Sequence, residues 1–131
     1  MKVLALDYGS ARTGVAASDP TGTVARPVGV VERASTEAGL ARLAELVRAE
    51  NPERIVVGLP LTLRGDRGEQ AIETERFVEA LRAAVDVPIE SFDERFTTSL
   101  ASQTGSHSSE DARAAAHLLT SYLAWRSSRT S

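Results

Sequence analysis

The chain has 131 residues, of which 42% are hydrophobic and 25% are charged, so we expect residues 1–131 to form a single domain with a buried core. No apolar run approaches the ~20 residues of a membrane-spanning helix, and no signal-peptide pattern follows Lys2, so we expect a cytoplasmic protein without a membrane partner. The lack of cysteine excludes disulfides, zinc–thiolate sites and thiol nucleophiles, and the net charge of −3 excludes nucleic-acid binding by bulk charge alone.

The first predicted element is a strand at residues 3–6, which ends in the carboxylate of Asp7. Four consecutive apolar residues are typical of a strand that is buried on both faces. Gly9 and Gly14 bracket a short polar turn, and residues 15–18 have the pattern of a returning strand. Because a buried carboxylate is costly unless donors or a cation meet it, two interpretations of Asp7 stay open. It is either a turn residue that accepts from backbone N–H groups or a metal ligand at the end of the sheet.

Strands and helices are predicted to alternate along the rest of the chain. A third strand at 28–31 precedes a helix that begins near Thr36, as its cap, and ends before Asn51. A second apolar strand at 55–59 ends at Pro60, and a polar loop follows it. The remaining predicted elements are a helix that presents Ala71, Thr74, Val78, Leu81 and Val85 on one face, a strand at 87–92, a polar stretch at 101–109 and a helix from about 110 to 125.

This order of elements predicts an α/β fold. The first three strands have short connections and should be antiparallel, whereas helices separate the later strands, which should run parallel to the first. We therefore expect a mixed five-stranded sheet flanked by helices. Ligands bind such open sheets at the carboxyl ends of the parallel strands, where Asp7 and the pair Asp93 and Glu94 are placed.

A further acid, Asp111, belongs to the last predicted helix. It shares helical spacing with Ala115, Leu118 and Tyr122, which puts it on the face that packs against the sheet. The alternative is a capping box at residues 108–111, in which Asp111 would only bind the helix start. Considered together, acids at two strand ends and on an inward helix face can hold Mg²⁺ through carboxylate oxygens. Two such ions about 3.5–4 Å apart can activate water for phosphodiester cleavage.

Four segments, in order, resemble the motifs of one known family. Residues 7–16 resemble the pattern D-x-G-x-x-R-x-G-x-A, and residues 57–61 resemble V-G-L-P. Residues 93–98 resemble D-E-R-[LF]-[ST]-T, and residues 111–115 resemble the D-x-x-A-A start of the last family helix. The family is YqgF, also called RuvX, within the ribonuclease H-like superfamily. The resemblance implies a ribonuclease H-like fold and a metal-dependent nuclease, described in this family as a pre-16S rRNA nuclease and as a Holliday junction resolvase.

The resemblance also implies which residues act. It carries the catalytic and metal-binding roles to Asp7, Glu94 and Asp111, with Mg²⁺ or Mn²⁺ as the cofactor. Asp93 is the alternative to Glu94, because alternation along a strand points only one of two neighbours inward. The segment from 98 to 111 is shorter than in the family and lacks its usual basic cluster.

Four arginines in the loops that should border the acids are the predicted substrate-binding residues: Arg12, Arg64, Arg67 and Arg95. The alternative for each is ordinary surface charge, and Arg95 could instead neutralise Asp93 and Glu94. The expected partner is nucleic acid. RNA is favoured over branched DNA because junction resolution normally needs a symmetric dimer, and the sequence shows no clear dimer seam. Monomer and homodimer both stay open.

We therefore expect 5′-end processing of precursor 16S rRNA, in ribosome biogenesis. A Holliday junction resolvase and a catalytically silent RNA-binding assembly module are the alternatives.

Two histidines lack metal-ligand spacing and are interpreted as structural or surface residues, His107 within the polar stretch and His117 on the last helix. Tyr122 and Trp125 lie at helical spacing and are predicted to belong to the core.

Overall fold

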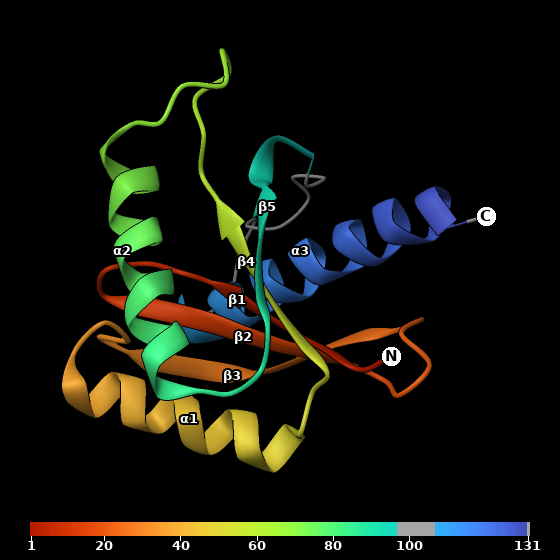
Figure 1. Cartoon of the computed structure of the whole chain (residues 1–131), viewed down its shortest axis with the longest axis horizontal. Helices are drawn as coiled ribbons and strands as arrows, with labels where there is room; N and C mark the ends of the chain where they lie inside the picture. Colours follow the sequence, from red (N-terminus) through yellow and green to blue (C-terminus); the bar gives the residue numbers. More distant parts are fainter. Residues whose placement is uncertain (97–106, 131) are drawn as a thin grey trace.

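Five strands form one mixed sheet in the order β3-β2-β1-β4-β5 (Figure 1). The structure is a computed structural model, which describes residues 1–96 and 107–130. Its elements are β1 (Val3–Asp7), β2 (Arg12–Ser18), β3 (Ala25–Glu32), α1 (Glu37–Glu50), β4 (Arg54–Leu59), α2 (Glu69–Ala84), β5 (Ile89–Asp93), the short 3₁₀ helix η1 (Glu94–Phe96) and α3 (His107–Thr130).

The strand directions follow the lengths of the connections. β2 pairs with β1 and with β3 in antiparallel fashion, through two short turns. β4 pairs with β1, and β5 with β4, in parallel fashion, because a helix separates each of these strands from the one before it. The predicted α/β class and the mixed five-stranded sheet are confirmed.

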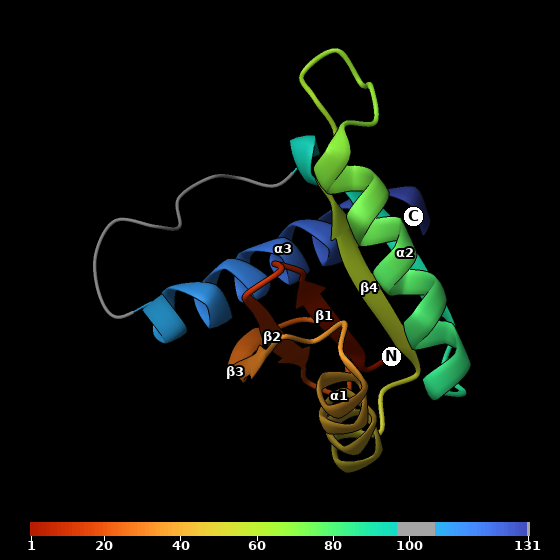
Figure 2. The same cartoon turned by 90° about the vertical axis from the view of Figure 1, so that its left-hand side faces the viewer.

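The two faces of the sheet have separate hydrophobic cores, and Figure 2 shows α3 lying apart from α1 and α2. Alternation along β1 divides its side chains between the faces. Leu4 and Leu6 pack in the core that α1 and α2 cover, and Val3 and Ala5 pack in the core that α3 covers. In the described part of the chain, the second core therefore depends on one helix, α3, which contributes Ala115, Leu118, Leu119 and Tyr122.

The ends of α1 lie where the sequence predicts them. Thr36 is the N-cap, and its hydroxyl oxygen accepts from the backbone N–H of Gly39 at 3.1 Å. Asn51 closes the helix in the left-handed conformation, with φ of 50°, and its N–H donates to the carbonyl of Val47.

Other boundaries differ from the prediction. β3 is longer than residues 28–31, β5 runs from Ile89 to Asp93, and Val85 caps α2 instead of lying within it. The last helix begins at His107, so placing His107 in a loop was wrong. The capping box at 108–111 was also wrong, because Asp111 lies in the second turn, where its backbone packs against β2. The rest of the predicted polar stretch, and the shortened segment around it, lie largely outside the described residues.

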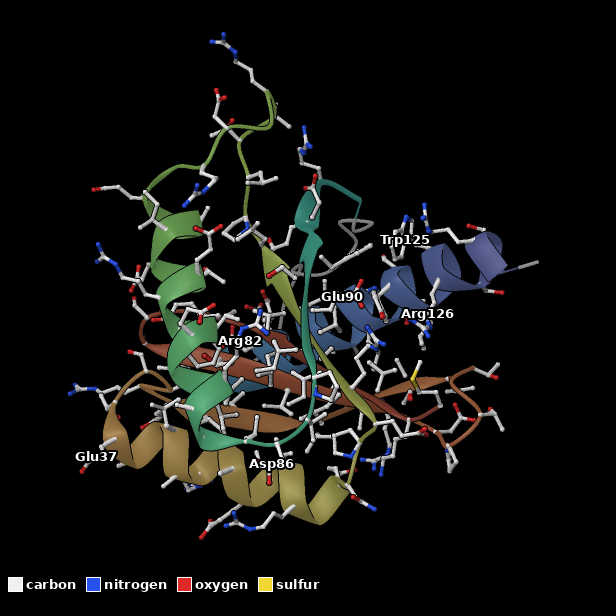
Figure 3. All side chains as sticks on the ribbon, viewed as in Figure 1. Glu37, Arg82, Asp86, Glu90, Trp125 and Arg126 are labelled. Carbon is white, nitrogen blue, oxygen red and sulfur yellow. The ribbon has the colours of Figure 1, made fainter. Side chains whose placement is uncertain are left out.

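Polar contacts fix α3 to β5 (Figure 3, where Glu90, Trp125 and Arg126 are labelled). The hydroxyl of Tyr122 donates to Glu90 at 2.7 Å, and Arg54 donates to the same carboxylate oxygen at 2.8 Å. Tyr122 is fully buried, as predicted. Trp125 is partly buried, and the centroid of its ring lies 5.6 Å from the ring centroid of Phe92. None of the helices in the described ranges combines the length and the hydropathy that spanning a bilayer requires.

Candidate active site

Two carboxyl groups meet at the carboxyl edge of the sheet. Asp7 ends β1, and Glu94 follows β5, which lies on the far side of β4. The two side chains nevertheless contact each other and are hydrogen-bonded. Gly58 of β4 makes this possible, because a Cβ atom there would stand only 2.6 Å from Oε2 of Glu94. Glu94 therefore crosses over β4 in the space that a larger residue would fill.

Burial changes the acidity of both groups. Burial raises the pKa of Asp7; the nearby charge of Asp111 adds to the rise, and the hydrogen bond with Glu94 opposes it. Burial, followed by the charge of Asp7, raises the pKa of Glu94 to about 7. Both shifts have the same origin: two carboxylates that lose water and face each other are unstable unless a proton or a cation joins them.

Asp111 approaches this pair from α3, the helix that covers the face of the sheet shared by Val3, Ala5 and, by alternation, Asp7. Its backbone lies directly on Gly14 of β2, where a Cβ atom would overlap the carbonyl oxygen of Asp111. Gly14 pairs with Asp7 across the sheet, so it lies between the two acids. The carboxylate of Asp111 accepts from Nε of Arg12 at 2.7 Å. Over residues 1–96 and 107–130, no three His, Cys, Asp or Glu side chains form a metal-holding group.

Asp93, the alternative to Glu94, has a different partner. Arg95 donates to it from Nε at 2.9 Å and from Nη2 at 2.6 Å. These hydrogen bonds, with the positive charge of Arg95, hold the pKa of Asp93 below its ordinary value. Of the two neighbours, the structure therefore brings Glu94, and not Asp93, to Asp7.

The four predicted arginines fall into two groups. Arg12 and Arg95 lie beside the acids and are paired with Asp111 and Asp93. Arg64 and Arg67 belong to the loop between β4 and α2, which projects beyond the sheet (Figure 1). Arg64 is exposed, and Arg67 donates to Glu75 at 2.6 Å. Nothing tests the substrate contacts of these arginines, so that assignment stays a prediction.

A small cavity of about 150 Å³ opens onto Asp7 and Glu94. Its wall includes Tyr8 and Glu73, and the hydroxyl of Tyr8 donates to Glu73 at 3.3 Å. Glu73 is a further acid near this edge of the sheet, and the sequence did not indicate it. An acid on an exposed helix face is ordinary, so its position in α2 carried no signal.

The donor set suits a hard divalent cation. The carboxyl groups of Asp7 and Glu94 offer oxygen ligands only, and they already need a positive partner to relieve their repulsion. Asp111 can join them by exchanging its ion pair with Arg12 for the cation. His117 is half-buried on α3, and the wall of the small cavity does not include it.

Comparison with known proteins agrees with this picture. The family model described as "RuvX: Holliday junction resolvase" matches residues 1–125. A Chloroflexus aggregans protein is 45% identical over 101 residues, which cover 77% of this chain and 71% of the relative. A Syntrophomonas wolfei protein is 35% identical over an alignment of 132 positions, which covers 94% of this chain and 94% of the relative. Both relatives are named "Putative pre-16S rRNA nuclease".

Solved structures show the same fold at lower identity. The chain of Thermus thermophilus RuvC in complex with a Holliday junction substrate superposes with a TM-score of 0.64 at 19% identity, covering 98% of this chain and 96% of that one. RuvC from the same organism in a second structure gives a TM-score of 0.62 at 20% identity, with 98% and 97% covered. At these identities the likeness concerns the fold. The match of the family model to nearly the whole sequence, with the two relatives, shows that this chain belongs to the RuvX family.

Proposed function

We propose that this protein is a metal-dependent nuclease that hydrolyses phosphodiester bonds in the 5′-end processing of precursor 16S rRNA. The observation that carries the proposal is the meeting of Asp7 and Glu94 over Gly58, with Asp111 close enough to raise the pKa of Asp7. The names of the relatives support RNA as the substrate. Work on precursor rRNA also implies a cytoplasmic location.

Asp7, Glu94 and Asp111 are the proposed ligands of Mg²⁺ or Mn²⁺. A bound divalent cation supplies activation of water and stabilisation of the leaving oxygen. The chain supplies the positions of the oxygens. β1 and β5 fix Asp7 and Glu94, and the packing of α3 on Gly14 fixes Asp111. Arg12 lies beside this site, where its guanidinium can bind a phosphate oxygen once Asp111 turns to the cation.

The function is tested by cleavage of a precursor 16S rRNA fragment. We expect cleavage with Mg²⁺ or Mn²⁺, little with Ca²⁺, and none in excess chelator, because the ligands are hard oxygens and Ca²⁺ accepts a looser geometry. Gel analysis of a 5′-labelled transcript measures both rate and cut position. Undiminished cleavage in chelator would show that the acids act without a metal.

A four-way DNA junction is the second substrate for the same assay, because the matching family model is described as a resolvase. Preferred cleavage of the junction, with two symmetric cuts, would favour that function over rRNA processing. The active species should then be a dimer, which size-exclusion chromatography with light scattering detects.

Glu94→Gln and Asp93→Asn form a matched pair of changes at adjacent positions. Glu94→Gln should weaken Mn²⁺ binding more than about 100-fold, because even groups that only support a ligand cost 10–100-fold. Asp93→Asn should change it little, since Asp93 is paired with Arg95. Titration of Mn²⁺ followed by electron paramagnetic resonance measures both. Equal losses in the two variants would return Asp93 to the ligand set.

Arg12→Ala should have opposite effects on metal and substrate. Removal of the guanidinium that pairs with Asp111 frees a carboxylate for the cation, so Mn²⁺ affinity should rise several-fold. The same change should weaken RNA binding and reduce its salt slope by about 0.7, because one phosphate contact with a single strand is lost. Calorimetric titrations with Mn²⁺ and with RNA measure the two quantities separately. A fall in both affinities would mean that Arg12 only supports the fold.

A further inference from the structure

A second and larger hollow adjoins the candidate active site. It is a groove of about 630 Å³ between the end of β3 and the first turns of α1, the end of that helix where Glu37 is labelled in Figure 3. Arg12 lines it and also pairs with Asp111, so one side chain connects the groove to the acids. The wall also includes Glu32, Arg33, Thr36 and Arg42.

The groove carries positive charge that is free to act on a ligand. Arg33 and Arg42 are exposed, and neither forms an ion pair with any residue in the described ranges. Among the described residues that line the groove, Glu32 is the one acid. Since the whole chain has a net charge of −3, this concentration of guanidinium groups contrasts with the average surface.

The backbone holds this charge in a fixed place. The N–H of Arg33 donates to the carbonyl of Ala11 at 2.9 Å, which joins the segment between β3 and α1 to the residue that precedes Arg12. Arg33 itself has a φ of 49°, and its carbonyl accepts from the hydroxyl of Thr36 at 2.7 Å. Gly39 packs so closely on this turn that a Cβ atom would overlap the carbonyl oxygen of Arg33. The groove is therefore positioned relative to β1 and Asp7.

We propose that this arginine groove, formed by Arg12, Arg33 and Arg42, binds the phosphodiester backbone of the nucleic-acid strand next to the scissile bond. The proposal rests on the proposed nuclease function and adds the path of the substrate. Without a bound cation, Asp7, Glu94 and Glu73 repel phosphate, so the metal-free protein must attract a strand from outside their cavity. Arginine presents a planar fork of donors that matches phosphate oxygens, and the groove offers three along its wall.

The test measures RNA binding in excess chelator, so that metal-bridged contacts are absent and no cleavage occurs. The probe is a fluorescein-labelled single-stranded RNA, followed by anisotropy over a range of salt concentrations. The variant is the double change Arg33→Gln and Arg42→Gln. The matched control is Arg48→Gln with Arg76→Gln, which removes two exposed arginines that lie outside the groove. Thermal melts verify that both double variants fold like the parent protein.

We expect the groove variant to lose about 1.4 units of salt slope, since each single-strand phosphate contact contributes about 0.7. At 0.1 M salt the affinity should fall more than about tenfold, and the control should bind like the parent. Amide resonances of Arg33 and Gly39 in the parent protein should also shift when unlabelled RNA is added. The second measurement needs no substitution, so it holds even if a variant folds poorly.

The outcomes separate this proposal from the nuclease function. If the groove variant and its control lose affinity equally, or if neither does, the groove does not bind the strand, whether or not the parent cleaves RNA. The proposal is also wrong if poly-glutamate shifts the amide resonances of Arg33 and Gly39 and RNA does not shift them. If RNA binds in the groove but no divalent metal supports cleavage, the groove is upheld and the nuclease function fails.

Discussion

Replacement of Asp7 with Asn should reduce cleavage at least about a thousandfold and should also stabilise the metal-free protein. The loss in rate follows because a neutral amide is a poor ligand for a divalent cation, and a deficit of about 4 kcal/mol at the transition state costs about a thousandfold. The gain in stability follows because Asn removes one of two facing buried charges and can donate a hydrogen bond to Glu94.

The stability that Asp7→Asn gains over the parent should increase as the pH rises. Folding raises the pKa of Asp7 and of Glu94, the latter to about 7, so the folded state holds more protons than the unfolded one. The metal-free parent should therefore lose stability as the pH rises from the ordinary carboxyl range to about 7. Asp7→Asn should lose less over the same range.

Melting temperatures in chelator at pH 5 and pH 8 measure this effect. We expect the variant to melt roughly 3–8 °C higher than the parent at pH 8 and close to it at pH 5. Asp86→Asn is the control, because Asp86 is exposed and precedes β5 at the end opposite to Glu94. A destabilised Asp7→Asn variant at pH 8 would show that Asp7 has a structural hydrogen-bonding role, as the turn interpretation holds.

Gly14→Ala should have the largest effect on the fold. The added Cβ would overlap the carbonyl oxygen of Asp111, and both atoms belong to or adjoin rigid backbone, so neither can rotate away. Overpacking of this kind costs about 3 kcal/mol, at the upper end of the usual range, and should lower the melting temperature by about 10 °C. Because Gly14 lies between Asp7 and Asp111, the displacement should also separate the two acids.

Gly29→Ala is the matched control. Gly29 also lies in the antiparallel part of the sheet, on β3, and a Cβ there would meet no atom within 4 Å. Its melting temperature should differ little from that of the parent. Gly14→Ala should both destabilise the fold and separate Asp7 from Asp111. Measurement of Mn²⁺ affinity distinguishes these two effects, because the affinity should fall even at a temperature where the variant is fully folded. Unchanged Mn²⁺ affinity in the folded variant would remove Asp111 from the ligand set.

The parts of the fold that sequence predicts are those with local causes. Four apolar residues before Asp7, the cap at Thr36 and the end of the helix before Asn51 each depend on a few neighbouring residues, and all are found. The start of the last helix was placed too late. Near that start, Asp111 packs on Gly14, which lies 97 positions away in the sequence, so a local pattern does not reveal the contact. The periodicity of α3 identified the face toward the sheet and not the length of the helix.

The candidate site also has features that the sequence predicts and features that only the structure shows. Strand ends alone bring Asp7 and Glu94 to one edge, so topology was enough to predict their approach. Topology does not show that Glu94 passes over Gly58, nor that Arg12 holds Asp111. The exposed arginines of the groove, Arg33 and Arg42, belong to no motif, and their grouping is seen only when β3 and α1 are placed beside the β1–β2 turn.

The packing of α3 over one face of the sheet determines how the protein opens. If α3 detaches, it exposes Val3, Ala5, Val56 and Phe92 at once and carries Asp111 away, whereas the core under α1 and α2 keeps its contacts. Amide hydrogen exchange should then show α3 as a separate cooperative unit that opens before the sheet. A ligand that bridges Asp7 and Asp111 would slow exchange along the whole helix, so the protection of α3 reports on occupancy of the site.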